Sequence, residues 1–246
     1  MPHRIATAIV LGLLAHSAVQ GAELRVVSSN GVTGLLRELG PKFEQATGNT
    51  LIVHYDTTQA LTSSINAGED FDVAILTQPA VEALASSGKC AAGTGIARSG
   101  IGVAVRAGAA RPDVTTTAAL KRTLLAAKSV GFSSNGASGL YVEDLLQRLG
   151  VAQRVNTKAQ RYTSDQLAAR LAAGDVELVI QQISEIHVMQ GIAYLGPLPA
   201  ELQHETVFTA AIGAHAHDPA VAQALVGFLT APEAAPIIRA NWMQPP

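Results

Sequence analysis

The stretch ELRVVSSNGVTGLLRELGPKFEQATGNTLIVHY, residues 23–55, contains two β-rich runs separated by a helical pattern. The β-rich runs are residues 24–27 and 51–55. Between them, residues 32–47 repeat apolar side chains on one helical face, and Gly48 ends the helix. The apolar residues of that face are Leu35, Leu36, Leu39 and Phe43. A strand, a helix and a second strand in this order are typical of βαβ units around a mostly parallel sheet.

The same alternation continues to the end of the chain. The pattern predicts strands over residues 71–76, 100–105, 129–132, 177–181 and 206–211, and helices over 60–67, 81–87, 118–126, 139–149, 165–173, 219–229 and 232–240. A loop rich in Gly, Ala, Pro and Asp at residues 107–113 interrupts the alternation, as a crossover between two folded parts does. We therefore predict two α/β lobes: residues 23–103 plus 203–246 form lobe 1, and residues 104–202 form lobe 2.

The first residues have the pattern of a secretory signal peptide. Arg4 is the only charged residue of this segment, an apolar run follows over residues 5–15, and Val19 and Gly21 supply small side chains before a cleavage site. The apolar run has about half of the ~20 residues that a membrane-spanning helix needs. We predict a signal peptide over residues 1–22 and a soluble mature protein in the periplasm.

The composition excludes several classes of function. The chain has 17 basic and 19 acidic residues, and loss of Arg4 with the leader leaves 16 against 19, a formal charge of −3. A surface so close to neutral argues against a nucleic-acid partner. Cys90 is the only cysteine, so an intrachain disulfide is impossible and a small buried side chain is expected there. We expect a monomer without a cofactor.

A histidine-rich motif near the C-terminus does not predict a metal site. His215 and His217 superficially resemble metal ligands, but Asp218 is the natural N-cap of the helix that begins with Pro219. We therefore expect no metal in this protein.

Four turns rich in small or hydroxyl residues precede predicted helices, at residues 28–31, 56–59, 133–139 and 162–165. Helix N-termini offer unpaired N–H donors and a partial positive charge, so several that converge make an anion site without buried Lys or Arg. The hydroxyl groups have a second interpretation, because Ser and Thr often cap helices without touching a ligand. The residues to which both interpretations apply are Ser28, Thr58, Ser138 and Ser164.

These turns belong to a series of landmarks whose order and spacing resemble a known family. The landmarks are Ser28-Ser29-Asn30-Gly31, Thr57-Thr58 before Leu61, Asp72-Val73, Ala137-Ser138-Gly139 followed by Tyr141, and Gly196-Pro197-Leu198-Pro199. In them the mature chain resembles the periplasmic molybdate-binding proteins and the broader type II solute-binding proteins of ABC transporters. The resemblance implies an α/β fold of two lobes, the type II periplasmic-binding-protein fold, with mixed, mostly parallel sheets joined by two crossover strands. It also implies a small anionic ligand between the lobes and an ABC transporter permease as partner.

The chain departs from the molybdate pattern where that family holds its oxyanion. Gly31 and Thr58 stand in place of two serines, and Gln182 in place of a tyrosine, while Ser138 and Ser164 stand at backbone amide donors. These changes suggest a roomier site that reaches groups of an organic acid. Arg98 is either a guanidinium for a ligand carboxylate or a solvated surface residue. The predicted ligand-binding residues are Ser28, Ser29, Asn30, Gly31, Thr57, Thr58, Arg98, Ser99, Ser138, Gly139, Tyr141, Ser164 and Gln182.

An enzyme is the alternative function. The periplasmic aconitate isomerases are also similar in sequence, and they move a proton along an allylic tricarboxylate. That reaction needs an anion clamp and a base whose pKa is tuned toward neutrality. The candidate bases are His54, Tyr55 and Glu185, each with a second interpretation: the first two residues fill the faces of a strand, and Glu185 is a solvated loop residue.

Overall fold

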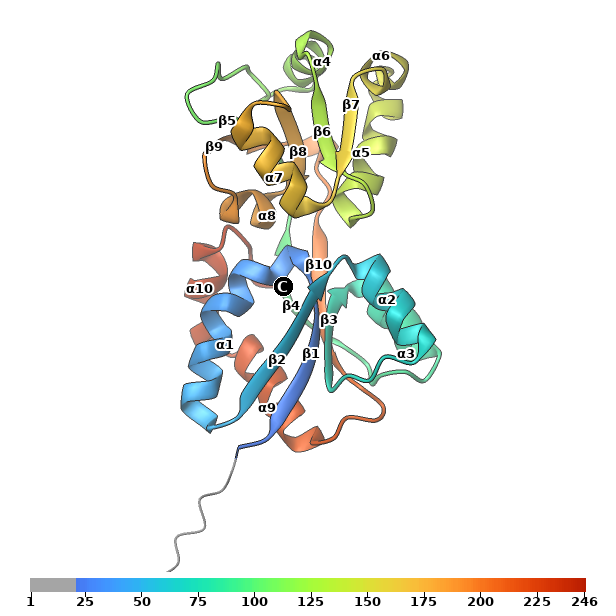
Figure 1. The fold of residues 1–246 in the computed structure, drawn as a ribbon, viewed down its shortest axis with the longest axis vertical. Coiled ribbons are helices and arrows are strands. Elements are labelled where there is room, and N and C mark those ends of the chain that lie inside the picture. The colour runs from blue at the N-terminus through green and yellow to red at the C-terminus, as the bar shows by residue number, and fades with distance from the viewer. Residues whose placement is uncertain (1–20) are drawn as a thin grey trace, which may run out of the picture.

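The computed structural model describes residues 21–246, and the predicted signal peptide lies almost wholly outside the described residues. The described chain forms two α/β lobes stacked end to end (Figure 1), each around its own five-stranded sheet. The strand orders are β2-β1-β3-β10-β4 in lobe 1 and β7-β6-β8-β5-β9 in lobe 2. Each sheet has two parallel and two antiparallel strand pairs, which confirms the predicted two-lobed type II fold but not the expectation that the sheets are mostly parallel.

Lobe 1 buries both faces of its sheet. Its strands are β1 (Glu23–Ser29), β2 (Thr50–Asp56), β3 (Val73–Thr77), β4 (Thr94–Ser99) and β10 (Thr206–Ile212). Its helices are η1 (Asn30–Val32), α1 (Thr33–Thr47), α2 (Thr58–Ala67), α3 (Gln78–Ser86), α9 (Pro219–Thr230), η3 (Pro232–Ala234) and α10 (Ala235–Ala240). The apolar residues predicted for α1 pack with α9 and α10 on one face, and α2 and α3 cover the other.

Lobe 2 repeats this layered arrangement. Its strands are β5 (Ile101–Arg106), β6 (Val130–Ser133), β7 (Ala159–Tyr162), β8 (Leu178–Gln182) and β9 (Ile192–Pro197). Its helices are α4 (Thr117–Ala126), α5 (Ala137–Arg148), α6 (Ala152–Asn156), α7 (Ser164–Ala173), α8 (Ile183–Val188) and η2 (Ala200–Leu202). Helices α4, α5 and α6 pack on one face of the sheet, and α7 and α8 on the other.

The chain passes between the sheets twice. It leaves lobe 1 at Gly100, between β4 and β5, and returns through residues 198–205, between β9 and β10. Strand β10 then pairs antiparallel with both β3 and β4. The division of the chain into domains at residues 103 and 203 stays a prediction.

Five strands and α-helices were absent from the sequence-based prediction: β4, α6, β7, α8 and β9. Helices α6 and α8 have five and six residues, which is too short for a helical period to be visible. Strand β7, AQRY, is polar, and β4 contains Gly95 and pairs with β10 across a register shift. The remaining predicted elements are present, with boundaries that differ by a few residues.

Among residues 21–246 no single helix is long and apolar enough to span a membrane. Helix α9 and the segment 232–240 that follows it meet the criteria of length and composition only as a pair, bent by 53°.

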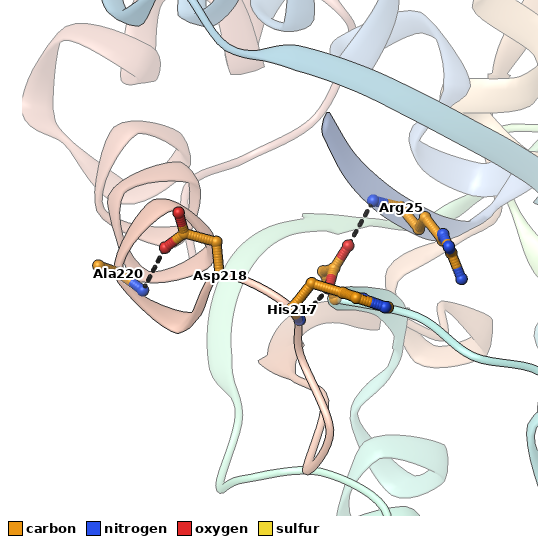
Figure 2. A network of polar contacts seen from close by, with 5 residues as sticks. Arg25, His217, Asp218 and Ala220 are labelled. Carbon is orange, nitrogen blue, oxygen red and sulfur yellow. Dashed lines mark hydrogen bonds and ion pairs between the residues drawn. The ribbon is translucent and has the colours of Figure 1, made fainter. Parts of the chain in front are cut away.

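A buried carboxylate joins three distant segments at the base of lobe 1 (Figure 2). Asp72 has 0% exposure and accepts hydrogen bonds from the backbone N–H of Arg25 at 2.7 Å and of His217 at 2.6 Å. The His217 ring nitrogen Nδ1 lies 3.1 Å from the same carboxylate, so this histidine is engaged locally. Asp218 caps α9 as predicted, because its side chain accepts from the N–H of Ala220. Within the described residues no group of three or more metal-ligating side chains forms.

The charged form of Asp72 stabilises the native state. Burial raises the pKa of Asp72, but hydrogen bonds from Arg25 and His217 outweigh it and hold the pKa below its ordinary value. Its contribution is therefore fully present above the unfolded value of about 3.9 and is lost as pH falls through the lower native pKa.

We predict that Asp72→Asn lowers the free energy of unfolding at pH 7 by about 1–3 kcal/mol, because an amide cannot accept all three contacts. Urea unfolding at a series of pH values measures this. The difference from the unmodified protein should shrink below pH about 4. The exposed neighbour Asp70→Asn is the control and should change little; an equal loss in both variants would refute the role of Asp72.

Candidate functional site

Residues from most of the predicted polar turns line a cleft between the lobes. Its volume is about 490 Å³. One wall is formed by α1 and the β2–α2 connection of lobe 1, and the other by α7 and α8 of lobe 2. Its lining residues are Asn30, Thr33, Arg37, Tyr55, Asp56, Thr57, Thr163, Ser164, Asp165, Ala168, Glu185, Val188 and Met189. A larger hollow of about 880 Å³ lies beside the crossover strands, but none of the four predicted turns contributes to its lining. The interlobe cleft is therefore our candidate site.

The lobe 1 wall is built at the carboxyl ends of β1 and β2. The hydroxyl of Thr57 accepts from the N–H of Ala60 at 3.2 Å and caps α2. The carboxylate of Asp56 accepts from the N–H of Thr57 at 2.6 Å. Burial raises the pKa of Tyr55, and the nearby Arg37 guanidinium partly opposes this. The wall therefore combines a helix N-terminus, a carboxylate and a cation.

Arg37 is the functional candidate that the sequence prediction missed. It lies one turn after Thr33 on α1, and both residues line the cleft. The only available signal was their i, i+4 spacing on the side of α1 opposite its apolar face. A charged residue on a polar helix face is ordinarily just solvated, so this signal is weak.

The lobe 2 wall contains a chain of hydrogen bonds that joins α5, β8, α7 and α8. The hydroxyl of Ser138 donates to Oε1 of Gln181, and Nε2 of Gln181 donates to the hydroxyl oxygen of Ser164 at 3.2 Å. The Ser164 hydroxyl in turn donates to Oε2 of Glu185 at 2.6 Å. Ser138 and Gln181 are buried, whereas Ser164 and Glu185 reach the cleft. The chain thus connects the interior of lobe 2 to a carboxyl group in the cleft.

Glu185 is the group in the cleft with the most perturbed acidity. Its side chain is only partly exposed, and desolvation raises its pKa from 4.5 to about 7, against the opposing hydrogen bond from Ser164. It lies on α8, which packs against η1 and α1 of lobe 1. By contrast, the hydroxyl of Thr163 helps to hold the pKa of Asp165 below its usual value. Near neutral pH the cleft therefore holds one carboxyl that changes charge readily.

The structure brings five predicted site residues to the cleft lining: Asn30, Tyr55, Thr57, Ser164 and Glu185. Six others do not line the cleft: Ser28, Ser29, Gly31, Ser138 and Gly139 are buried, and Thr58 is partly buried with its hydroxyl accepting from the N–H of Thr77 at 3.4 Å. A Cβ atom at Gly31 would lie 2.2 Å from the ring of Phe208, and one at Gly139 would lie 1.9 Å from the carbonyl oxygen of Ser133. These two glycines are therefore required for packing.

Two predicted residues lie at the crossover. Gln182 donates from Nε2 to the carbonyl oxygen of Ser99 at 3.1 Å, and the Ser99 hydroxyl accepts from the N–H of Ser184 at 3.2 Å. Both Ser99 and Gln182 are buried. Their side chains join β4 to the end of β8, and neither lines the cleft.

Three predicted residues are not brought into the cleft. Arg98 pairs with Glu205 at 3.4 Å, where β4 and β10 run side by side. Tyr141 donates its hydroxyl to the carbonyl oxygen of Leu202 and stacks on His204. His54 extends from β2 to Glu69 at 3.0 Å, with 54% of its side chain exposed, and it does not line the cleft.

Known proteins resemble this chain over most of its length. The family model of bacterial extracellular solute-binding proteins matches residues 24–244. An aconitate isomerase from Pseudomonas sp. is 33% identical over 230 residues, covering 90% of this chain and 87% of the relative. The molybdate-binding protein ModA of Azotobacter vinelandii is 27% identical over 244 residues, covering 96% and 95%.

Solved structures share the fold at lower identity. The periplasmic molybdate-binding protein of Azotobacter vinelandii superimposes with a TM-score of 0.77 at 19% identity, covering 91% of this chain and 99% of that one. A periplasmic thiamin binding protein gives a TM-score of 0.73 at 16% identity, covering 95% and 86%. These likenesses support the two-lobed architecture.

We predict that Glu185→Gln makes the ligand-free protein more stable than the unmodified protein at pH 8.5 but not at pH 4.5. Because the native pKa of Glu185 is above its unfolded value, its contribution is fully present below that unfolded value and is lost as pH rises through about 7. Calorimetric melting across this pH range measures the difference. Ser164→Ala should destabilise the protein most at high pH, since it removes a donor to the carboxylate. A constant difference between Glu185→Gln and the unmodified protein would contradict the buried titration.

Proposed function

The chain belongs to the family of bacterial extracellular solute-binding proteins, and from this premise we propose that it binds a small organic acid in the interlobe cleft. We further propose that it acts in the periplasm as a monomer and delivers its ligand to an ABC transporter permease. The signal-peptide pattern of residues 1–22 supports export.

The observation that carries the proposal is a guanidinium in a cleft of organic-ligand size. Clefts of about 300–1,000 Å³ are typical for organic ligands, and about 490 Å³ falls in that range. Arg37 offers a bidentate partner for a carboxylate. The N-termini of α2 and α7, at Thr57 and Ser164, add backbone N–H donors. A tetrahedral inorganic oxyanion would leave most of this volume to water.

Closure of the lobes around the ligand would increase the binding affinity. Hydrogen bonds to a carboxylate strengthen when water is excluded, and hinge closure around a ligand is the common motion of two-lobed binding proteins. The crossover segments at Gly100 and at 198–205 are the two covalent links across which such a motion would occur.

The test is a thermal-shift and calorimetric panel on the mature protein. We expect citrate, tricarballylate and the aconitate isomers to raise the melting temperature by mass action, and molybdate, tungstate, sulfate and phosphate to have little effect. Arg37→Met should lower the affinity for tricarballylate at least about tenfold, since a charge-assisted hydrogen bond contributes about 1.5–3 kcal/mol. The exposed Arg154→Met is the matched control. Stabilisation by inorganic oxyanions alone would contradict the proposal.

A second candidate function is isomerisation of an unsaturated organic acid, and Glu185 is the observation that favours it. A general base works best with a pKa near the working pH, which the pKa of about 7 satisfies. The carboxylate would take a proton from the allylic carbon and return it to the other end of the C=C–C unit, so atoms and charge balance. The aconitate isomerase relative supports this candidate.

Interconversion of cis- and trans-aconitate, followed by proton NMR, separates the two functions. If the protein is an isomerase, Glu185→Gln should lower turnover by about 10²-fold or more while the ligand still binds. The control variant Glu233→Gln, at an exposed position, should isomerise aconitate at the rate of the unmodified protein. Tight binding of both isomers without interconversion would exclude the enzyme and leave the receptor.

A further inference from the structure

The charges that line the cleft do not suit a polyanion. Within the described residues the lining carries one guanidinium, Arg37, and three carboxyl groups, Asp56, Asp165 and Glu185. A ligand with two or three carboxylates would therefore enter a site that already has an excess of negative charge when all three carboxyls are ionised. Like charges in a partly desolvated cleft oppose binding strongly.

Glu185 is the carboxyl that can give up its charge, and the hydrogen bonds behind it have a fixed direction. The backbone N–H of Gln182 donates to Oε1 of Gln181 at 3.1 Å, which identifies that atom as the amide oxygen. The Gln181 amide nitrogen must then donate to Ser164. Because the Ser164 oxygen accepts this bond, its own proton is directed to Oε2 of Glu185.

This direction determines where a proton on Glu185 would lie. The Ser164 hydroxyl already donates to Oε2, so a protonated Glu185 could donate back to the Ser164 oxygen only if the Ser164 proton turned away to another acceptor. While Ser164 keeps its bond to Oε2, the proton of Glu185 would lie on Oε1, the oxygen to which Ser164 does not donate, and Glu185 is one of the residues that line the cleft. It would be a hydrogen-bond donor for the ligand.

We propose that Glu185 binds the ligand in its protonated form and donates its O–H to an anionic oxygen of the ligand, so that each binding event takes up a proton at this residue. The inference rests on the proposed binding of an organic acid in the cleft. The ligand class is thereby narrowed to acids that place a carboxylate against α8 while another carboxylate reaches Arg37.

The surroundings of Glu185 agree with proton uptake. The charged groups that share the cleft lining with Glu185 are Asp165 on α7, Asp56 on β2 and Arg37 on α1. Tyr55 also lines the cleft from β2. On α8 itself, His187 contacts Trp242, with ring centroids 4.7 Å apart. Burial already raises the pKa of Glu185 to about 7, and an incoming anion raises it further.

Calorimetric titration of the mature protein with tricarballylate tests the inference, because this saturated acid cannot be isomerised. Titrations at one pH in buffers with different enthalpies of ionisation give the number of protons taken up. We expect uptake to approach one proton per ligand at pH about 8, and affinity to fall by up to about tenfold per pH unit above 7.

Glu185→Gln supplies the discriminating comparison, since its amide also donates a hydrogen bond but cannot titrate. This variant should bind tricarballylate with little proton uptake and with an affinity that is flat from pH 7 to 8.5. Glu233→Gln should behave as the unmodified protein does. Thermal melting of each variant verifies that it is folded.

The possible failures are distinguishable. Binding without proton uptake, or uptake that persists in Glu185→Gln, would overturn the role of Glu185 and leave organic-acid binding intact. Failure of tricarballylate and citrate to bind even at pH 6, where Glu185 is largely protonated, would overturn both this inference and the proposed function.

Discussion

The structure depends on the way its parallel strands end at the interlobe cleft. Strands β1 and β2 of lobe 1 lead directly into η1 and α2, and β7 and β8 of lobe 2 lead into α7 and α8. Parallel strands carry their following helices from the same edge of a sheet, so these helix N-termini gather where the two sheets face each other (Figure 1). The return of the chain through β10, which pairs between β3 and β4, keeps those edges opposed.

The sequence predicted the gathering of helix N-termini but not all of the side chains that fill the cleft. The turns were visible because each strand, hydroxyl residue and helix are local in sequence. His54 and Tyr55 show the limit: adjacent residues on a strand point to opposite faces, and the structure places Tyr55 in the cleft lining and His54 beside Glu69. For Arg98 the sequence left two interpretations open, because its partner Glu205 is 107 residues away.

The same limit explains why Gln181 was missed. In sequence it is the last part of a buried strand, and nothing local indicates that its amide connects Ser138 to Ser164, at separations of 43 and 17 residues. Buried amides of this kind are stable only when their donors and acceptors are all satisfied. Glu185 was recognised as a candidate base from its residue type, but its altered acidity comes from burial on α8, an element too short to predict.

A carboxyl group with a pKa near 7 suits both proposed functions of the cleft. As a protonated donor, Glu185 compensates an incoming carboxylate; as a carboxylate, it is a base strong enough to remove an activated proton. The fold does not decide between these roles, because the same walls hold the ligand in both. The decision depends on whether an acidic C–H of the ligand lies within reach of the oxygen that Ser164 leaves free. In both proposals Arg37 holds a carboxylate of the ligand and Glu185 is the same residue, so the orientation of the ligand would decide between receptor and isomerase.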